Sequence, residues 1–391
     1  MYKKIVFTSL ITFIILIIGH MSVLLIVDPL SISKIRVVAK EFYIKEMRFQ
    51  AASLINNESF DSAIVGTSMA ANFQANEASK LLNGKFLNLS LDGSLLKERK
   101  VVLKHLLTNK NVKTLIISLD GATENQRNQG IPINSWSFLY NDNYFDDLYI
   151  YTNRKYMEYI NCHSLFQNEL VTAIQSITAR LIRKCPQSNI LIDIHGLTEW
   201  QSDPKHNTRF GGIQNWIKNK DHGQIKAAIR KTRKAVKDIN NYTRSELLKL
   251  KSDEHDYNQF EKNIVPLIKE NKSTKFILFF PPYSIVKYAI DYQSNPSSFN
   301  NYREYVKNVA LEAEKYSNVE IYWFSDYEFI NDIANYKDNG HYHGKFNSMF
   351  LNVFRNENSN ISSQNYNTKL EKLENRAKVF NLRLFAENFN N

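Results

Sequence analysis

Three short apolar runs in the first third of the chain constrain its fold more than any other feature. They are Ser62–Val65, Phe86–Leu91 and Thr114–Leu119, and each precedes small or turn residues and then a stretch with helical spacing. This alternation over residues 61–120 predicts a parallel sheet with helices on its faces. Two later apolar runs, Lys275–Phe280 and Val319–Phe324, flank another helical pattern. The sequence therefore predicts an α/β fold, a three-layer sandwich with a five-stranded, mostly parallel sheet.

Residues 121–274, between the third and fourth runs, are too many for a simple crossover, which needs about a dozen residues. We therefore expect a large, mainly helical insertion that caps the functional site. It contains helical patterns near residues 153–184, a loop-rich stretch near 197–216, and a basic segment from Lys226 to Lys251. In that segment nine Lys or Arg stand against Asp238 and Glu246, so it holds seven of the chain's eleven excess positive charges.

The basic segment has the spacing of an amphipathic helix over residues 225–239. Its apolar stripe consists of Ile225, Ile229, Thr232, Val236 and Ile239. Its opposite face consists of Lys226, Arg230, Arg233, Lys234 and Lys237. Such a face is either an ordinary solvated helix surface or a contact for an anionic lipid or polymer.

Residues 5–27 contain no charged residue and would rise about 34 Å as a helix, which is long enough to cross a bilayer. A cleavable signal peptide would have a shorter apolar region and an A-x-A-like site, whereas VDPLSIS follows here. We therefore expect an uncleaved transmembrane anchor, followed by a helical neck at residues 28–57. Lys3 and Lys4 precede this apolar run, and Lys34, Arg36 and Lys40 follow it, so the flanking charges leave the orientation of the anchor in the membrane open.

Several smaller features complete the expected organisation. Residues 58–120 and 275–355 would form the two parts of the core, and residues 356–391 a peripheral helical tail. Cys162 and Cys185 would form a disulfide in an oxidising compartment, or could be two buried thiols.

Ser68 follows the first apolar run directly, in the stretch IVGTSMAANF. Ligands of open parallel sheets bind at the carboxyl ends of the strands, where this residue would lie. Two interpretations are open at this point. Ser68 either caps the helix that follows or is a nucleophile held at the edge of the sheet.

The stretch YKDNGHYHG, residues 336–344, places Asp338 three residues before His341. A carboxylate at that spacing can orient a histidine whose other ring nitrogen faces a serine. Alternatively, His341, His343 and Asp338 could bind a metal, or the loop could have no functional role. In FFPPYS, at the end of the fourth run, Tyr283 is a candidate for substrate contact.

The chain resembles the SGNH (GDSL-like) hydrolase superfamily in three features. These are a G-x-S serine after the first strand, a glycine after the second strand, and a D-x-x-H pair late in the sequence. Within this superfamily, the chain looks most like membrane-anchored proteins of bacterial cell-surface polymer clusters, including the D-alanyl-lipoteichoic-acid transfer type. The correspondence covers about residues 58–120 and 270–345. It implies a flavodoxin-like core.

The resemblance implies that Ser68 is the nucleophile, His341 the general base and Asp338 its orienting acid. It also implies that the N–H groups of Gly93 and Ser68 form an oxyanion hole. Thr67 replaces the aspartate of the G-D-S form, and Asp120 stands where the family has an asparagine donor. Asp120 could serve if protonated or by holding a neighbouring group. The site could otherwise suit a cationic acyl donor, or its catalysis could be weak or lost.

The apolar run at residues 5–27 and the resemblance together imply a single-pass protein of the bacterial inner (cytoplasmic) membrane whose catalytic domain faces the periplasm or the cell exterior. The resemblance further implies a serine esterase or O-acyltransferase that acts on cell-surface polysaccharide through an acyl-serine. The alternative is a non-catalytic accessory protein that binds carbohydrate or a membrane acyltransferase. No cofactor, metal or nucleic acid partner is expected.

Overall fold

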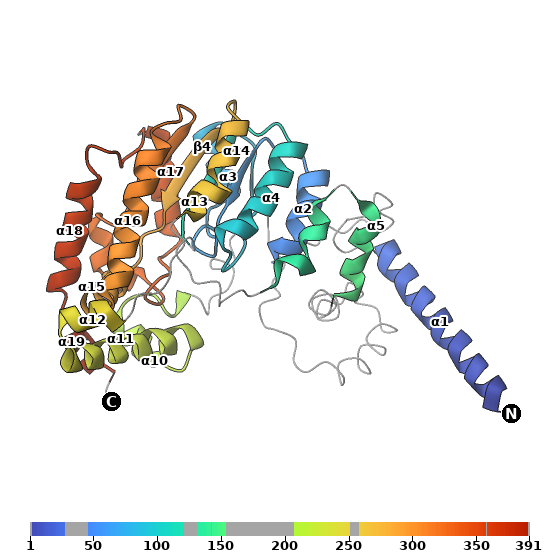
Figure 1. Ribbon diagram of the computed structural model, residues 1–391, viewed down its shortest axis with the longest axis horizontal. Helices are drawn as coiled ribbons and strands as arrows, with labels where there is room; N and C mark the ends of the chain where they lie inside the picture. Colours follow the sequence, from blue (N-terminus) through green and yellow to red (C-terminus); the bar gives the residue numbers. More distant parts are fainter. Residues whose placement is uncertain are drawn as a thin grey trace. The chain divides into compact units, whose positions relative to one another are not determined.

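The computed structural model describes residues 2–27, 46–120, 131–141, 143–153, 207–250, 258–356 and 358–389 (Figure 1). The chain divides into two compact units, residues 1–58 with 131–192 and residues 59–130 with 193–391. Both cysteines and the helical pattern near residues 153–184 lie outside the described residues, as do residues 28–45 of the expected neck.

The second unit is built on a five-stranded parallel sheet in the order β2-β1-β3-β4-β5. The strands are β1 (Ser62–Val65), β2 (Phe86–Asn88), β3 (Thr114–Ser118), β4 (Lys275–Phe280) and β5 (Val319–Trp323). All five therefore lie in the apolar runs that predicted them. Ser62 of β1 pairs with Phe86 on one side and Thr114 on the other. The predicted α/β architecture with a five-stranded sheet is confirmed.

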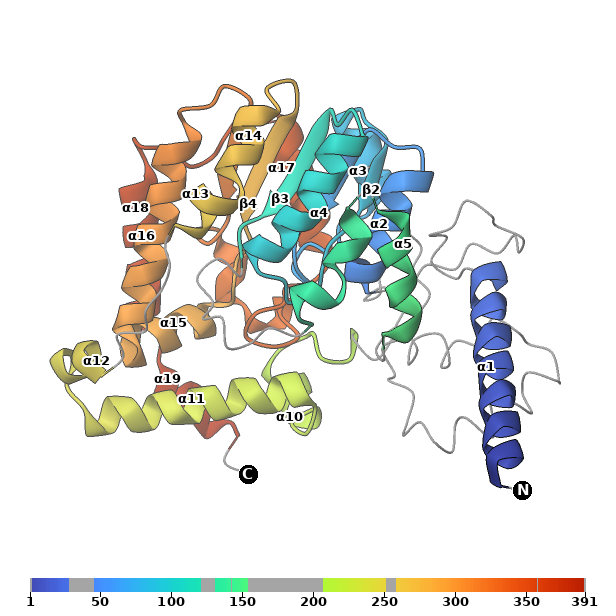
Figure 2. The ribbon, with the colours of Figure 1, turned by 45° about the vertical axis from the view of Figure 1, so that its right-hand side comes forward.

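Helices cover both faces of this sheet, which explains why its strands are almost continuously apolar. The crossover helices are α3 (Ala75–Leu82), α4 (Leu96–Asn109) and α16 (Pro296–Ala313). Helix α3 contacts α17 (Lys345–Asn356), whereas α4 contacts α13 (Gln259–Asn263), and these two pairs lie on opposite faces (Figure 2). An aromatic cluster fills the α17 side, where the rings of Phe324 and Phe350 stack with centroids 4.0 Å apart.

The described part of the insertion is helical, with α10 (Ile213–Lys218), α11 (Gly223–Asn241), α12 (Arg244–Leu250), α13 and α14 (Val265–Glu270). The predicted basic helix is confirmed as α11, which buries Ile225, Ile229 and Thr232 and exposes its cations. Of the stretch near residues 197–216 that was expected to be rich in loops, the structure describes residues 207–216, and a helix occupies the end of it. Gly211 and Gly212, at φ 95° and 101°, end the loop and α10 begins at Ile213.

The expected C-terminal tail is helical, and it packs against helices of the second unit. After α15 (Ile285–Ser294), β5 and two short helices, η5 (Glu328–Asn331) and η6 (Ile333–Asn335), the chain ends with α17, α18 (Tyr366–Val379) and α19 (Leu382–Glu387). Helix α18 contacts α15 and α16 and buries Leu370 and Leu373. Arg376 donates to the main-chain oxygens of Asp326 and Tyr327. The polar composition of the tail concealed these buried positions.

The first unit contains α1 (Tyr2–Val27), α2 (Met47–Asn57), η2 (Ile133–Ser135), η3 (Ser137–Tyr140), α5 (Tyr144–Asp147) and η4 (Leu148–Thr152). Tyr140 donates its hydroxyl hydrogen to main-chain oxygens of α2. Among the described helices, none combines the length and the apolar character that crossing a membrane requires. The helical part of the expectation for residues 5–27 is confirmed, and the membrane-spanning part is not.

Candidate active site

Ser68 follows the carboxyl end of β1, which pairs with β2 on one side and with β3 on the other. The chain adds β2 on one side of β1 and all later strands on the other side, so the strand order reverses between β1 and β3. Ligands of open α/β sheets bind at such a switch point. The carbonyl oxygen of Thr67 accepts from Ala70 and Ala71, so a helical turn begins at Ser68. Gly66 is required before it, because a Cβ there would overlap Ser118 and Ala70. Strand and turn together present the partly exposed Ser68 at the sheet edge.

The three residues predicted to act together do lie together, although Ser68 and His341 are 273 positions apart. Ser68 Oγ lies 2.9 Å from His341 Nε2. His341 Nδ1 lies 2.8 Å from Asp338 Oδ2. The serine, imidazole and carboxylate therefore form one continuous chain of hydrogen bonds.

The hairpin around Asp338 fixes the charge state of this carboxylate. Its Oδ1 accepts from the N–H groups of Gly340 at 2.8 Å and His341 at 2.9 Å. Burial raises the pKa of Asp338, but the charge of His341 and these hydrogen bonds lower the pKa more, so it lies well below its usual range. Because ionised Asp338 only accepts, the neutral form of His341 would carry its hydrogen on Nδ1 and turn the lone pair of Nε2 toward Ser68.

Two main-chain N–H groups near the serine are available to a ligand. Among the described residues, the N–H groups of Ser68 and Gly93 have no hydrogen-bond partner. Gly93 adopts φ 61° in the turn after β2, a conformation that favours glycine. The next residue, Ser94, donates its hydroxyl hydrogen to the Gly66 oxygen at 3.4 Å, so this turn lies against the end of β1.

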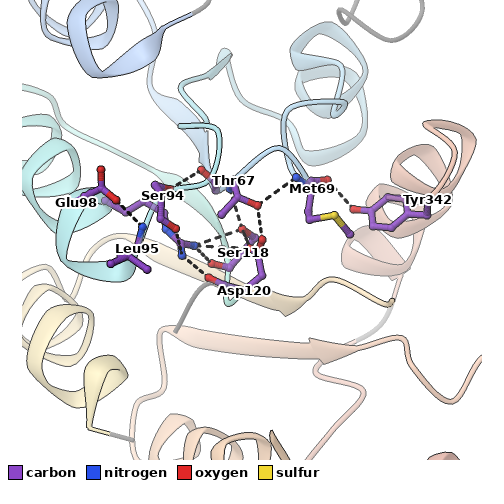
Figure 3. A network of polar contacts seen from close by, with 10 residues as sticks. Thr67, Met69, Ser94, Leu95, Glu98, Ser118, Asp120 and Tyr342 are labelled. Atoms are coloured by element: carbon purple, nitrogen blue, oxygen red, sulfur yellow. Dashed lines mark hydrogen bonds and ion pairs between the residues drawn. The ribbon is translucent and has the colours of Figure 1, made fainter. Parts of the chain in front are cut away.

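Two neighbouring hydroxyls hold the carboxylate of Asp120, which favours a holding role over the oxyanion donor role considered for it. Its carboxylate oxygens accept from two hydroxyls, Oδ2 from Thr67 and Oδ1 from Ser118 at 2.5 Å (Figure 3). The guanidinium of Arg99, on α4, lies 3.9 Å from Oδ1. A carboxylate that accepts from two hydroxyls beside a cation is an acceptor, and it is nearly buried. Of the options open for Asp120, holding a neighbouring group is the one that matches these contacts.

Tyr342 holds the other side of the serine turn. Its hydroxyl donates to the Met69 carbonyl oxygen at 2.7 Å (Figure 3). Burial raises the pKa of Tyr342, and the negative charge of Asp120 raises it further, so the phenol stays neutral and can donate. The residue after His341 thus contacts the residue after Ser68, which fixes the base relative to the serine.

The other residues singled out from the sequence lie around the same hairpin. The ring of Tyr283 packs against Gly340, and the Tyr336 hydroxyl donates to the Tyr283 oxygen at 3.2 Å. His343 is occupied elsewhere, because its ring contacts Phe210 and its Nδ1 accepts from the Lys345 N–H. In the part of the chain that the structure describes, no three His, Cys, Asp or Glu side chains gather as a metal site.

Arg99, Ser118 and Tyr342 are parts of the site that the sequence patterns did not predict. Arg99 alone gave a signal, because it lies on the face of α4 that buries Leu96, Val102 and Leu103. A charged residue on an apolar helix face indicates a buried partner. Ser118 and Tyr342 resemble ordinary strand and loop residues, and only the fold reveals their contacts.

Comparison with known proteins adds no assignment. No protein-family model matches the chain, and no curated protein matches it significantly. The parallel sheet and its strand order are consistent with an SGNH-like fold.

Proposed function

We propose that the protein is an SGNH-type serine esterase or O-acyltransferase. The observation that carries this proposal is the hydrogen-bonded chain from Ser68 Oγ through His341 to Asp338. Serine, imidazole and carboxylate in this order are the parts needed to make a serine hydroxyl nucleophilic.

The reaction would begin when Ser68 Oγ attacks the carbonyl carbon of an ester and its proton passes to His341 Nε2. The negative oxygen of the tetrahedral intermediate would lie against the free N–H groups of Ser68 and Gly93. Protonated His341, paired with Asp338, would then give its proton to the leaving alcohol oxygen as the ester bond breaks. The acyl-serine that remains would pass its acyl group to water or to a sugar hydroxyl, which His341 would deprotonate.

The proposed substrate and location rest on the resemblance seen in the sequence and not on the contacts of the site. We propose a small acyl ester on bacterial cell-surface polysaccharide as the substrate. Location at the inner (cytoplasmic) membrane, through residues 5–27, stays a prediction. Helix α1 supports an association of this kind because it exposes Phe7 and Phe13, at 65% and 61% of their surfaces.

One observation favours the alternative of a non-catalytic protein that holds a carbohydrate or a membrane acyltransferase. Because Asp120 accepts at both oxygens, the site lacks the side-chain donor that the family's asparagine provides. Loss of one oxyanion donor typically costs about a hundredfold to a thousandfold in rate. The alternative therefore predicts an intact triad with negligible turnover.

Hydrolysis of a small aryl acetate by the full chain separates the two functions. The wild-type protein should release acetate, and Ser68→Ala should reduce the rate to that of the buffer. Ser348→Ala, which removes a hydroxyl bonded to Glu77 between α17 and α3, is the control and should keep full activity. An inert wild-type chain would favour the accessory function.

A further inference from the structure

A buried guanidinium behind the site connects the loop after β2, which carries the free N–H group of Gly93, to the end of β3. Arg99 is fully buried on α4. It donates to the main-chain oxygens of Ser118 and Asp120 at the end of β3, and to that of Ser94 at 3.3 Å in the loop after β2. Ser94 directly follows Gly93. One side chain therefore fixes the Gly93 turn relative to β3.

Thr67 connects Asp120 to the backbone around the nucleophile. Its hydroxyl donates to Asp120 Oδ2 and accepts from the Met69 N–H at 3.2 Å (Figure 3). Its own N–H donates to Ser118 Oγ at 3.3 Å. Ser68 lies between Thr67 and Met69, so the backbone on both sides of the nucleophile is held.

The negative charge of Asp120 suits every contact in this network. Ser118 donates its hydroxyl hydrogen to Oδ1, because its oxygen already accepts from the Thr67 N–H and from the Arg99 guanidinium. The Thr67 hydroxyl donates to Oδ2 and accepts from the Met69 N–H. A carboxylate offers acceptors to both hydroxyls, whereas an asparagine would direct an N–H₂ group at one of them. The nearby Arg99 offsets the buried charge.

We infer that Arg99 and Asp120 form a positioning pair that fixes the N–H groups of Ser68 and Gly93 relative to each other. In this arrangement, the aspartate does not touch the oxyanion. The pair replaces the missing side-chain donor by orienting the two main-chain donors, Asp120 through Thr67 and Arg99 through Ser94. This inference rests on the proposed function, because oriented donors matter only where negative charge develops on a substrate oxygen.

Thr67→Val and Thr67→Ser in the full chain test the inference, because valine keeps the shape of threonine and serine keeps its hydroxyl. With an aryl acetate, Thr67→Val should lower kcat about a hundredfold with little change in KM, since donors misplaced by about 1 Å can cost that much. Thr67→Ser should restore most of kcat. The affinity for a trifluoromethyl ketone, which forms a tetrahedral adduct with a serine, should fall in parallel with kcat, while acetate affinity should not.

The outcomes distinguish this inference from the proposed function. If the wild-type chain does not hydrolyse the ester, both fail. If the wild type is active and Thr67→Val keeps its kcat and its ketone affinity, the positioning inference alone is overturned. Should Thr67→Val not fold, as judged by its circular dichroism and melting, Ser118→Ala takes its place, because it removes the hydroxyl between Asp120 and Thr67. Activity that declines only with the folded fraction would also overturn the inference.

Discussion

Asp338 is the residue on which the charge distribution of the site depends. Its low pKa means that it is ionised at neutral pH and only accepts hydrogen bonds, which sets the tautomer of His341. An ionised partner also stabilises the imidazolium that forms when Ser68 loses its proton. The residue thus acts on the reaction through His341 without touching a substrate.

Asp338→Asn should lower kcat/KM for an aryl acetate by about a thousandfold or more, because the amide can turn its N–H₂ group toward His341 and favour the wrong tautomer. Folding stability should change with pH as well. A carboxyl with a lowered pKa stabilises the fold above its unfolded pKa of about 3.9 and loses that contribution as pH falls through the folded value.

Urea unfolding at pH 7 and pH 3 measures this second effect. The free energy of unfolding of the wild type should begin to fall below about pH 4, and Asp338→Asn should show a smaller acid dependence. Asp332→Asn, which removes a carboxylate that only caps the short helix η6, is the matched control. Equal acid dependence in the wild type and in Asp338→Asn would contradict the account.

At the scale of residues, the sequence predicted the three residues of the hydrogen-bonded chain better than the residues that hold them in place. Ser68, Asp338 and His341 were found because each stands directly after a strand or inside a recognisable local motif. The role of Asp120 could not be predicted from its place in the sequence. The contacts that make it an acceptor come from Thr67, 53 positions earlier, and from Arg99 on another element. Such contacts depend on the packing of the fold.

At the scale of elements, strands were predictable because burial on both faces makes them continuously apolar. Strand β2 is shorter than its apolar run, yet Leu89 and Leu91 still donate to main-chain oxygens of residues 64 and 66, both at 2.8 Å. The apolar run Phe86–Leu91 therefore matches the segment that hydrogen-bonds to the β1 region better than the bounds of β2 do. Helix α18 was harder to place, because only Leu370, Leu373 and Ala377 of its mostly polar sequence are buried.

At the scale of the whole molecule, four basic residues of the second unit line one cavity. A cavity of about 650 Å³ lies along α11, and its lining includes Lys220, Lys226, Arg230 and Arg233, with Asp221 as an acid. Lys226 and Arg230 have no ion pair among the described residues. Of the two alternatives for the basic face, a cavity lined by cations favours contact with an anionic ligand over an ordinary solvated surface.

Dextran sulfate should therefore bind the full chain with an affinity that falls as salt rises, whereas neutral dextran should not bind. Replacing Lys226 and Arg230 by glutamate should weaken binding at least tenfold in isothermal titration. Lys104→Glu with Lys272→Glu makes the same change in net charge at exposed positions outside the cavity and should have a much smaller effect. Equal losses in the two double variants would show that net charge alone drives binding.

The central claim is that Ser68 is a nucleophile activated by His341, and the most direct test is covalent labelling of the full chain with a fluorophosphonate. Mass spectrometry of the digested protein should find the label on Ser68. Labelling should disappear in Ser68→Ala and be strongly slowed in His341→Ala, while His343→Ala should label as fast as the wild type. A wild-type chain that stays unlabelled, or that carries the label on another serine, would contradict the account.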